Sequence, residues 1–302
     1  AGGDIVNGGD GDDTFTVAGS GDGVDTFNGG IDFDRILGGT GNDTIGLKAF
    51  NAASSIELID GGAGIDVILG TTGNDTFDFS ATTLVNIAEI RGGKGNDVLT
   101  GSAGDDTFAV SGTTDGFDTF RGGGGIDRIL GGTGDDAIGI AGPFNAASSI
   151  EAIDGGAGLN YLRGNTGNDS LDFSATTLTN IARIEGGNGN DTIVGSAGDD
   201  TLVGGSGNDT ITGGGGDDTF AFASGSGTDT LTDFALGDHL RFDGFSVANL
   251  ILQQQGANVL VQFSGNSLRV TLQNTDVGDL GYSMGSGSEA GAVVVRLEDS
   301  LT

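Results

Sequence analysis

A nine-residue pattern, Gly-Gly-x-Gly-x-Asp-x-U-x with an apolar residue at U, recurs along most of this chain of 302 residues. In the stretch "GGNGNDTIVGSAGDDTLVGGSGNDTITGGGGDDTFA", residues 186–221, four copies follow one another without interruption. A unit of this length supplies one turn and one short strand, and it cannot bury its own apolar side chain. The repeat therefore requires a stack of coils in which burial occurs between neighbouring units.

The aspartate at position 6 of the unit defines the register. Asparagine takes this position once, at Asn160. The residue two places later, position 8, is apolar throughout, from Val6 to Phe220. The position-6 aspartates are Asp4, Asp13, Asp25, Asp34, Asp43, Asp66, Asp75, Asp97, Asp106, Asp118, Asp127, Asp136, Asp169, Asp191, Asp200, Asp209 and Asp218.

Each part of the unit favours one local structure. The glycines allow positive φ and close approach of backbones. The Thr, Ile, Val and Phe residues that follow favour a strand with position 8 pointing inward. Two units make one coil, and counting the position-6 residues and the spacers gives about 22 units, or 11 coils. The sequence thus predicts an all-β fold, a parallel β-roll (β-solenoid) of about 11 two-strand coils.

Four spacers interrupt the register. We expect each spacer to keep one strand and to replace the glycine loop by a longer excursion. Glu57 and Glu151 fall at position 6 of two spacers, whereas Ala88 and Ala182 leave this position without a carboxylate in the other two. The spacers are residues 47–60, 79–91, 140–154 and 173–185.

The chain also contains a longer duplication. Residues 12–104 resemble residues 105–198, including the spacer sequences "FNAASSIE" and "FSATTL". Each block holds nine units, and because nine is odd, equivalent spacers should lie on opposite sides of the roll. Two sides that carry the same spacer sequences would allow the roll to bind further copies of itself.

The predicted roll occupies residues 1–221 and ends with the tandem run 186–221. We expect the register to end at Ala221 and residues 222–302 to form a C-terminal β cap. Within this cap, "NVLVQF" (258–263) and "SLRVTL" (267–272) predict a β-hairpin. An open end of the roll would otherwise template aggregation.

The charge of −32, from 43 acidic and 11 basic residues, argues against nucleic acid and anionic membranes as partners. No run of 18 apolar residues predicts a membrane span, and the chain has no cysteine. Stacked carboxylates would repel one another unless a hard cation lies between successive loops. An oxygen-only ligand set favours Ca²⁺ over Zn²⁺, Cu²⁺ or Mg²⁺, and about 20 gaps between loops are expected to hold it.

The predicted ligands are position-6 carboxylates and carbonyl groups of the glycine loops. The loops of the tandem run carry the strongest prediction, with Gly187, Gly189, Gly205 and Gly207. The carboxylate ligands are Asp13, Asp25, Asp34, Asp43, Asp66, Asp75, Asp97, Asp106, Asp118, Asp127, Asp136, Asp169, Asp191, Asp200, Asp209 and Asp218.

The nonapeptide "GGSGNDTIT" (204–212) resembles the repeats-in-toxin (RTX) family, and the resemblance extends over residues 1–221. It implies a parallel β-roll with Ca²⁺ between consecutive loops. It also implies export by type I secretion machinery from a Gram-negative bacterium, with a secretion signal in residues 222–302 and folding outside the cell where calcium is abundant. The sequence departs from the family pattern at Asp32, at Asn160, at insertions before Asp25 and Asp118, and at the spacers.

No catalytic motif is visible, and a single histidine, His239, excludes a multi-histidine metal site. We therefore expect a protein that is not an enzyme. The first hypothesis is a secreted structural or adhesive subunit of a filament, surface layer or matrix, whose partner is another copy, a surface glycan or a protein. The alternative is the export and folding module of an RTX protease, lipase or epimerase with its catalytic domain upstream. Because the sequence begins within a repeat, we expect it to continue a longer chain.

Overall fold

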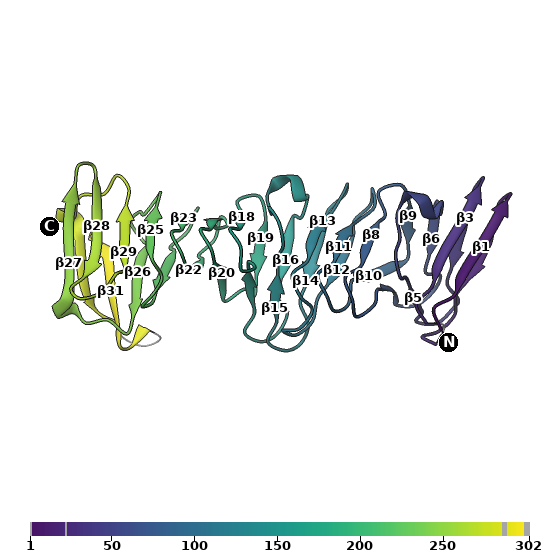
Figure 1. Ribbon diagram of the computed structural model, residues 1–302, viewed down its shortest axis with the longest axis horizontal. Coiled ribbons are helices and arrows are strands. Elements are labelled where there is room, and N and C mark those ends of the chain that lie inside the picture. Colours follow the sequence, from purple (N-terminus) through teal and green to yellow (C-terminus); the bar gives the residue numbers. More distant parts are fainter. Residues whose placement is uncertain (1, 22, 286–288, 299–302) are drawn as a thin grey trace. The chain divides into compact units, whose positions relative to one another are not determined.

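The computed structural model describes residues 2–21, 23–285 and 289–298. It contains two compact units. The first runs to Ala141 and includes Ala147–Asn160, and the second comprises Gly142–Ala146 and the residues from Tyr161 onward. In each unit short strands lie side by side (Figure 1). The predicted fold is confirmed: stacked parallel coils form an all-β solenoid of about 11 turns.

The strands of the first unit are short because each nonapeptide spends most of its residues on the loop. A 3-10 helix, η1 (Ala52–Ser54), lies in the first spacer, and η2 (Ala146–Ser148) lies in the third. The strands are β1 (Ile5–Asp10), β2 (Thr14–Thr16), β3 (Thr26–Ile31), β4 (Arg35–Leu37), β5 (Thr44–Gly46), β6 (Leu58–Asp60), β7 (Asp66–Leu69), β8 (Thr76–Asp78), β9 (Thr83–Val85), β10 (Ile87–Arg91), β11 (Val98–Thr100), β12 (Thr107–Ala109), β13 (Thr119–Arg121), β14 (Arg128–Leu130), β15 (Ala137–Gly139) and β16 (Ala152–Asp154).

Parallel ladders join strands from successive coils of the first unit. One ladder runs β2-β4-β6-β9, another β8-β11-β13, and a third β5-β7-β10-β12-β14-β16, while β1 pairs with β3. Position 8 of one coil faces position 8 of the next, as in the pairs Ile36 with Ile59 and Phe108 with Ile129. These four side chains are fully buried. The core is therefore the predicted apolar ladder enclosed by the strands.

The spacers contribute more structure than the single strand that was expected. Phe50 forms a β-bridge with Phe77, and its ring centroid lies 4.9 Å from that of Phe79. The second block repeats this arrangement, with Phe144 and Phe173 5.0 Å apart. The spacer 79–91 holds two strands, β9 and β10. These buried phenylalanines thus occupy a third strand position in the spacer coils, in addition to the two strands of an ordinary coil. The prediction of one strand per spacer is therefore wrong.

The duplicated blocks use different ladders. In the first block β4 and β6 pair in the ladder that contains β2 and β9. Their equivalents in the second block, β14 and β16, pair in the ladder that contains β10 and β12. Equivalent spacer strands therefore lie in different ladders of the first unit, and their placement on opposite sides of the roll stays a prediction.

The second unit continues the repeat and ends in antiparallel strands. It also contains the 3-10 helices η3 (Val247–Asn249) and η4 (Val277–Asp279). Its strands are β17 (Tyr161–Arg163), β18 (Ser170–Asp172), β19 (Thr177–Thr179), β20 (Arg183–Asn188), β21 (Thr192–Val194), β22 (Thr201–Ser206), β23 (Thr210–Thr212), β24 (Thr219–Phe222), β25 (Thr228–Leu231), β26 (His239–Asp243), β27 (Leu250–Gln255), β28 (Asn258–Phe263), β29 (Arg269–Leu272), β30 (Leu280–Met284) and β31 (Ala292–Leu297).

Two sheets form the walls of the second unit. One follows the order β17-β20-β22-β24-β26-β31-β30 and the other β18-β21-β23-β25-β29-β28-β27. The last strands of both sheets are antiparallel. The predicted hairpin is confirmed, since β28 and β29 pair antiparallel from Val259 with Leu272 to Gln262 with Arg269. An additional hairpin, β27 with β28, was not predicted.

The parallel register continues beyond Ala221. Leu231 pairs with Ile211, and Leu240 pairs with Phe220, in each case position 8 with position 8. The prediction that the register ends at Ala221 is wrong in this respect. It failed because two extra residues precede Leu231 and because the next loop has lost its first glycines. Among the described residues no helix has the length and apolarity needed to cross a bilayer.

Candidate metal-binding loops

The position-6 aspartates lie beside the first residues of the strands, so stacking of the coils places them one above another. A hydrogen bond connects each pair of neighbours. The backbone N–H of Asp169 donates to Asp191 Oδ1 (2.8 Å), Asp191 N–H donates to Asp209 Oδ1 (2.9 Å), and Asp209 N–H donates to Asp229 Oδ1 (3.0 Å). Each Oδ1 atom is therefore used to hold two coils together.

The same bond links every predicted carboxylate ligand into one of several short columns. Fourteen such bonds occur among the described residues, and the number of calcium ions between the loops stays a prediction. The spacers and the change of ladder interrupt the columns. The columns are Asp4–Asp25, Asp13–Asp34–Glu57, Asp43–Asp66, Asp75–Asp97–Asp118, Asp106–Asp127–Glu151, Asp136–Asn160, Asp169–Asp191–Asp209–Asp229 and Asp200–Asp218–Asp238.

Many of these carboxylates have a second oxygen that is buried and makes no hydrogen bond. A buried acceptor without a partner is costly, so such an atom indicates a missing partner. In the described part of the chain these atoms are the Oδ2 atoms of Asp13, Asp34, Asp66, Asp97, Asp127, Asp169, Asp191, Asp209 and Asp229.

A distinct loop conformation accompanies the unpartnered Oδ2 in every case except that of Asp169. The glycines at positions 2 and 4 have positive φ: 110° at Gly187, 121° at Gly189, 109° at Gly205 and 141° at Gly207. Asp32, which replaces a position-4 glycine, keeps φ at 79°, so this departure from the pattern does not change the loop. We call loops with positive φ at both positions and an unpartnered Oδ2 open loops.

The first glycine of the loop leaves room for a ligand. A Cβ atom added to Gly186 would overlap Asp191 Oδ2 and the carbonyl oxygen of Gly204 in the next coil. A carboxylate oxygen and a carbonyl oxygen therefore converge on a space that only glycine leaves free of a side chain. Oxygen donors of this kind fit Ca²⁺, which accepts carboxylates and backbone carbonyls in flexible geometry.

Comparison with known proteins identifies the repeat. The family model described as "RTX calcium-binding nonapeptide repeat (4 copies)" matches most of the chain. The matched residues are 1–18, 20–51, 53–81, 89–111, 112–138, 148–175, 185–220 and 195–231. This chain belongs to the RTX calcium-binding repeat family. Its repeats therefore bind Ca²⁺, and the open loops supply suitable oxygen donors.

One solved structure similar to this RTX chain is the extracellular lipase LipA from Serratia marcescens. The two chains are 23% identical, and the match covers 81% of the RTX chain with a TM-score of 0.33. The RTX chain spans 43% of the length of that lipase. No curated protein matches the RTX chain.

A second kind of RTX loop satisfies its own carboxylate. In residues 195–200 the N–H of Ser196 donates to Asp200 Oδ2 (2.6 Å) and the Ser196 hydroxyl donates to the same atom (2.9 Å). The glycine at position 4, Gly198, does not have positive φ. We call these self-capped loops. Their position-6 aspartates are Asp43, Asp75, Asp106, Asp136 and Asp200.

Burial raises the pKa of the column carboxylates. It raises the pKa of Asp118 to about 8, that of Asp229 to about 7 and that of Asp191 to about 6. In each case the loss of solvation is the largest cause, the backbone N–H from the preceding coil opposes it, and repulsion between neighbouring carboxylates adds to it. A cation between the loops would remove the cause of this rise by favouring the ionised form.

Sequence reasoning missed two sets of RTX loop residues. Asn and Asp at position 5 form another ladder that runs in the opposite direction: Asn208 N–H donates to Asn190 Oδ1 (2.8 Å), and Asn190 N–H donates to Asn168 Oδ1 (2.8 Å). The recurring pairs "ND" and "DD" could have indicated it. Asp229 and Asp238 extend the columns, and "GTDTL" (227–231) carries that signal.

Carboxylates do not gather in larger clusters. The described residues contain no group of three or more His, Cys, Asp and Glu side chains arranged to hold a metal ion. Each link in a column offers two acidic side chains at most. Backbone carbonyls must therefore complete a calcium shell, as the cradle at Gly186 indicates.

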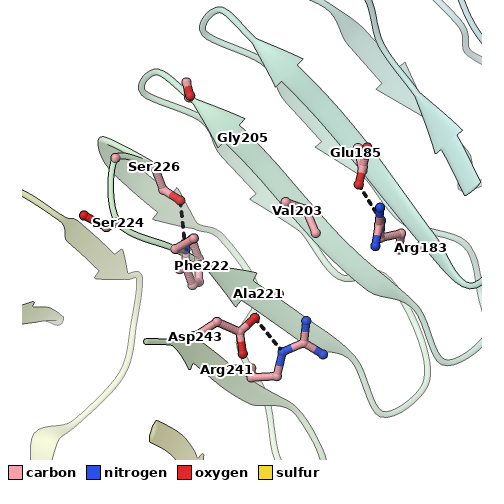
Figure 2. Close-up of a pocket in the computed structure, with 13 residues that line it drawn as sticks. Arg183, Glu185, Val203, Gly205, Ala221, Phe222, Ser224, Ser226, Arg241 and Asp243 are labelled. Atoms are coloured by element: carbon pink, nitrogen blue, oxygen red, sulfur yellow. Dashed lines mark hydrogen bonds and ion pairs between the residues drawn. The ribbon is translucent and has the colours of Figure 1, made fainter. Parts of the chain in front are cut away.

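Two of the basic side chains of the second unit line a cavity beside the loops of Asp209 and Asp229. This cavity of about 360 Å³ is lined by Arg183, Glu185, Arg241 and Asp243 among others (Figure 2). Arg183 pairs with Glu185 and Arg241 with Asp243, each within its own strand. Each arginine of the cavity therefore has a carboxylate partner of its own outside the columns.

Proposed function

We propose that this chain is a secreted RTX β-roll that completes its fold on binding Ca²⁺ outside the cell and then serves as an extracellular structural or adhesive subunit. The observation that carries the folding part is the set of buried Oδ2 atoms without partners in the open loops. RTX repeat proteins are typically secreted by Gram-negative bacteria, which supports the proposed location. Type I export machinery would pass the chain unfolded while calcium is scarce.

The protein's own residues perform three tasks in this proposal. The N–H to Oδ1 bonds between coils fix the position of each carboxylate, for example Asp209 above Asp191. The position-1 and position-2 glycines let the backbone of the next coil approach closely. The ladder of position-8 side chains, buried between the walls, stabilises the stack once the loops are closed. When bound, Ca²⁺ supplies the positive charge that the columns lack.

The columns explain why folding would depend on calcium. The chain carries a charge of −32, and its position-6 aspartates are concentrated in columns with one carboxylate per coil. Bringing these groups together without counter-charge costs both desolvation and repulsion. Because the binding site does not exist in the unfolded chain, the free energy of calcium binding contributes directly to folding.

The duplicated blocks support the role as a structural subunit. Equivalent strands β4 and β14 lie in different ladders, which supports the expectation that equivalent spacers lie on different sides of the roll. A molecule with like surfaces on two sides can bind further copies of itself on both, which closes a ring or extends a filament. The proposed partner is accordingly a second copy of the same chain.

Sedimentation velocity in 2 mM CaCl₂ and in excess chelator, over a range of protein concentrations, tests the assembly. We expect folded species larger than the monomer in calcium and expanded monomers in chelator. Folded monomers at every concentration in calcium would overturn the subunit role and leave calcium-dependent folding intact. Circular dichroism of the same samples separates the two outcomes.

A further inference from the structure

Two of the four spacers continue a column of carboxylates. Asp34 N–H donates to Glu57 Oε2 (2.8 Å), and Asp127 N–H donates to Glu151 Oε2 (2.7 Å). This is the bond that joins neighbouring aspartates elsewhere in the columns. The glutamates therefore take the place of a position-6 aspartate although the surrounding sequence has no glycine loop.

The same spacers also supply a carbonyl oxygen in the expected place. A Cβ atom added to Gly29 would overlap both the carbonyl oxygen of Ser55 and Asp34 Oδ2. At the equivalent position in the second block, a Cβ atom on Gly122 would overlap the carbonyl oxygen of Ser149 and the Oδ2 of the neighbouring aspartate. In a consensus step the carbonyl of a glycine occupies this place, as Gly204 does beside Gly186.

A strained backbone conformation directs these carbonyls. Ser55 has φ of 47° and Ser149 has φ of 49°, a left-handed conformation that is uncommon for serine. In the first spacer η1 precedes it, and Asn51 caps η1 through its side chain and the N–H of Ala53. The same conformation in both blocks indicates that the spacers preserve a carbonyl position rather than a sequence.

In both blocks the Oδ2 atom of the aspartate that precedes the spacer lacks a hydrogen-bond partner among the described residues. Asp34 and Asp127 have no exposed surface, and their Oδ2 atoms make no hydrogen bond within the described residues. Each Oδ2 therefore lies in a cradle formed with the spacer carbonyl and beside the spacer carboxylate. A buried anionic oxygen facing other oxygens needs a cation, since no donor reaches it.

The other two spacers provide an internal contrast. In the spacer 79–91, Asn86 has φ of 55° and directs its carbonyl oxygen toward Gly61 and Asp66 Oδ2. Position 6 of this spacer is Ala88, so the second carboxylate is missing. This spacer has the carbonyl without the charge, and its column ends there.

We propose that the glutamate-bearing spacers complete two further calcium sites. Their ligands are Asp34 Oδ2, the Ser55 carbonyl and the Glu57 carboxylate in the first block, and the equivalent atoms of Asp127, Ser149 and Glu151 in the second. This proposal rests on the proposed calcium-dependent folding of the roll. Glu57 is half-buried and Glu151 is exposed, so the first site should bind more tightly.

Charge-removing substitutions test the two sites. In the double variant Glu57→Gln, Glu151→Gln the amide oxygen can still accept the backbone N–H, so the link between coils is kept and only the charge is lost. Equilibrium dialysis with ⁴⁵Ca²⁺ should show two fewer ions bound per chain at a free calcium concentration that saturates the unsubstituted protein. The single variants should each lose one ion, with Glu57→Gln giving the larger fall in affinity.

A matched control uses glutamates outside the columns. The double variant Glu89→Gln, Glu185→Gln removes two carboxylates that pair with arginines on the same strands. It should bind as many calcium ions as the unsubstituted chain. Equal stoichiometry and affinity in the Glu57 and Glu151 variants would overturn the proposal.

Two further readouts keep the result decisive. Circular dichroism in saturating calcium verifies that each variant is folded; if the double variant is not, the single variants carry the test. The calcium titration of the unsubstituted chain is measured in parallel. Folding of that chain without calcium would contradict the proposed function, whereas unchanged ion binding by the variants contradicts only the spacer sites.

Discussion

The loops at residues 195–200 and 204–209 follow the same nonapeptide pattern but hold their aspartates differently. In the first, Ser196 at position 2 donates its N–H and its hydroxyl to Asp200 Oδ2. In the second, Gly205 has φ of 109° and Asp209 Oδ2 has no partner among the described residues. One loop satisfies its carboxylate from within the protein, and the other leaves it for a cation.

All the self-capped loops stand first in a column, although Asp13, which also stands first, lies in an open loop. Self-capped Asp43, Asp75, Asp106, Asp136 and Asp200 each stand first in a column, where no preceding aspartate donates its N–H to the carboxylate. Such a carboxylate takes its hydrogen bond from its own loop. Later members receive an N–H on Oδ1 from the coil before, and among the described residues Oδ2 has no partner in Asp34, Asp66, Asp97, Asp127, Asp191, Asp209 and Asp229. A repeated sequence thus produces two chemical states of one residue type.

Removal of calcium should have the largest effect. In excess chelator at pH 7.5 we expect loss of the β-sheet circular dichroism and an expanded chain, because the open loops then contain buried, mutually repelling carboxylates. Added Ca²⁺ should restore the signal, and Mg²⁺ at the same concentration should not, since it demands tighter octahedral geometry. An unchanged spectrum in chelator would remove the basis for distinguishing open from self-capped loops.

Acid should partly replace calcium. The folded-state pKa values of Asp118, Asp229 and Asp191 lie at about 8, 7 and 6, above the value of 3.8 for a solvent-exposed aspartate. The folded form therefore binds more protons, so these groups favour folding below pH 3.8 and lose that contribution as pH rises through 6 to 8. Each unit of difference between the folded-state and unfolded-state pKa of a group corresponds to about 1.4 kcal/mol in the free energy of unfolding.

The predicted fall in stability with rising pH can be checked in buffer from which a chelating resin has removed calcium. Circular dichroism should show more β structure at pH 5 than at pH 8. In saturating calcium the trend should reverse, because protons compete with the cation for the same oxygens. More structure at pH 8 than at pH 5 without calcium would contradict the burial of the column carboxylates.

Substitution of one carboxylate should separate the two loop types. Asp209→Asn keeps the acceptor for the N–H of Asp191 but places an amide in the open cradle. It should lower the free energy of unfolding by about 3 kcal/mol, because a cation present at a hundredfold excess over its Kd stabilises the folded state by that amount. Asp200→Asn keeps the bond from Ser196 and should cost about 1 kcal/mol. Urea unfolding in 5 mM CaCl₂ measures both, and equal losses would mean that the loop types do not differ in their dependence on calcium.

Much of the fold could be predicted from the period of the sequence. Position 8 fixed the inward ladder, because an apolar residue every nine residues can be buried only between stacked strands, as Ile36 and Ile59 are. Position 6 likewise indicated where the carboxylates gather. The hairpin of β28 with β29 followed from simple alternation. These features depend on spacing alone.

Other features depend on contacts between distant residues. The third strand position at Phe50 arises because that side chain packs on Phe79, 29 positions later in the sequence numbering. The distinction between open and self-capped loops does not follow from the residue at position 2, since Gly39 and Gly132 belong to self-capped loops. The prediction that the chain is not an enzyme, the alternative of an enzyme's export module, the secretion signal and the cap stay predictions, since none of them follows from the stacking of coils.

The smallest effect is expected from the hydroxyl group of Ser196. Ser196→Ala keeps the N–H bond to Asp200 and removes the hydroxyl, which also accepts the N–H of Gly198 (3.1 Å). We expect a loss of about 1 kcal/mol in the free energy of unfolding. This loss should persist when calcium is lowered, because the hydroxyl bond stabilises the loop without a cation. Ser206→Ala, at an exposed position 3 of the neighbouring open loop, is the control and should leave the free energy of unfolding unchanged. If both variants unfold at the same urea concentration, the backbone N–H alone caps the loop, as it does at Gly39 and Gly132, and the hydroxyl adds nothing to the difference between the loops.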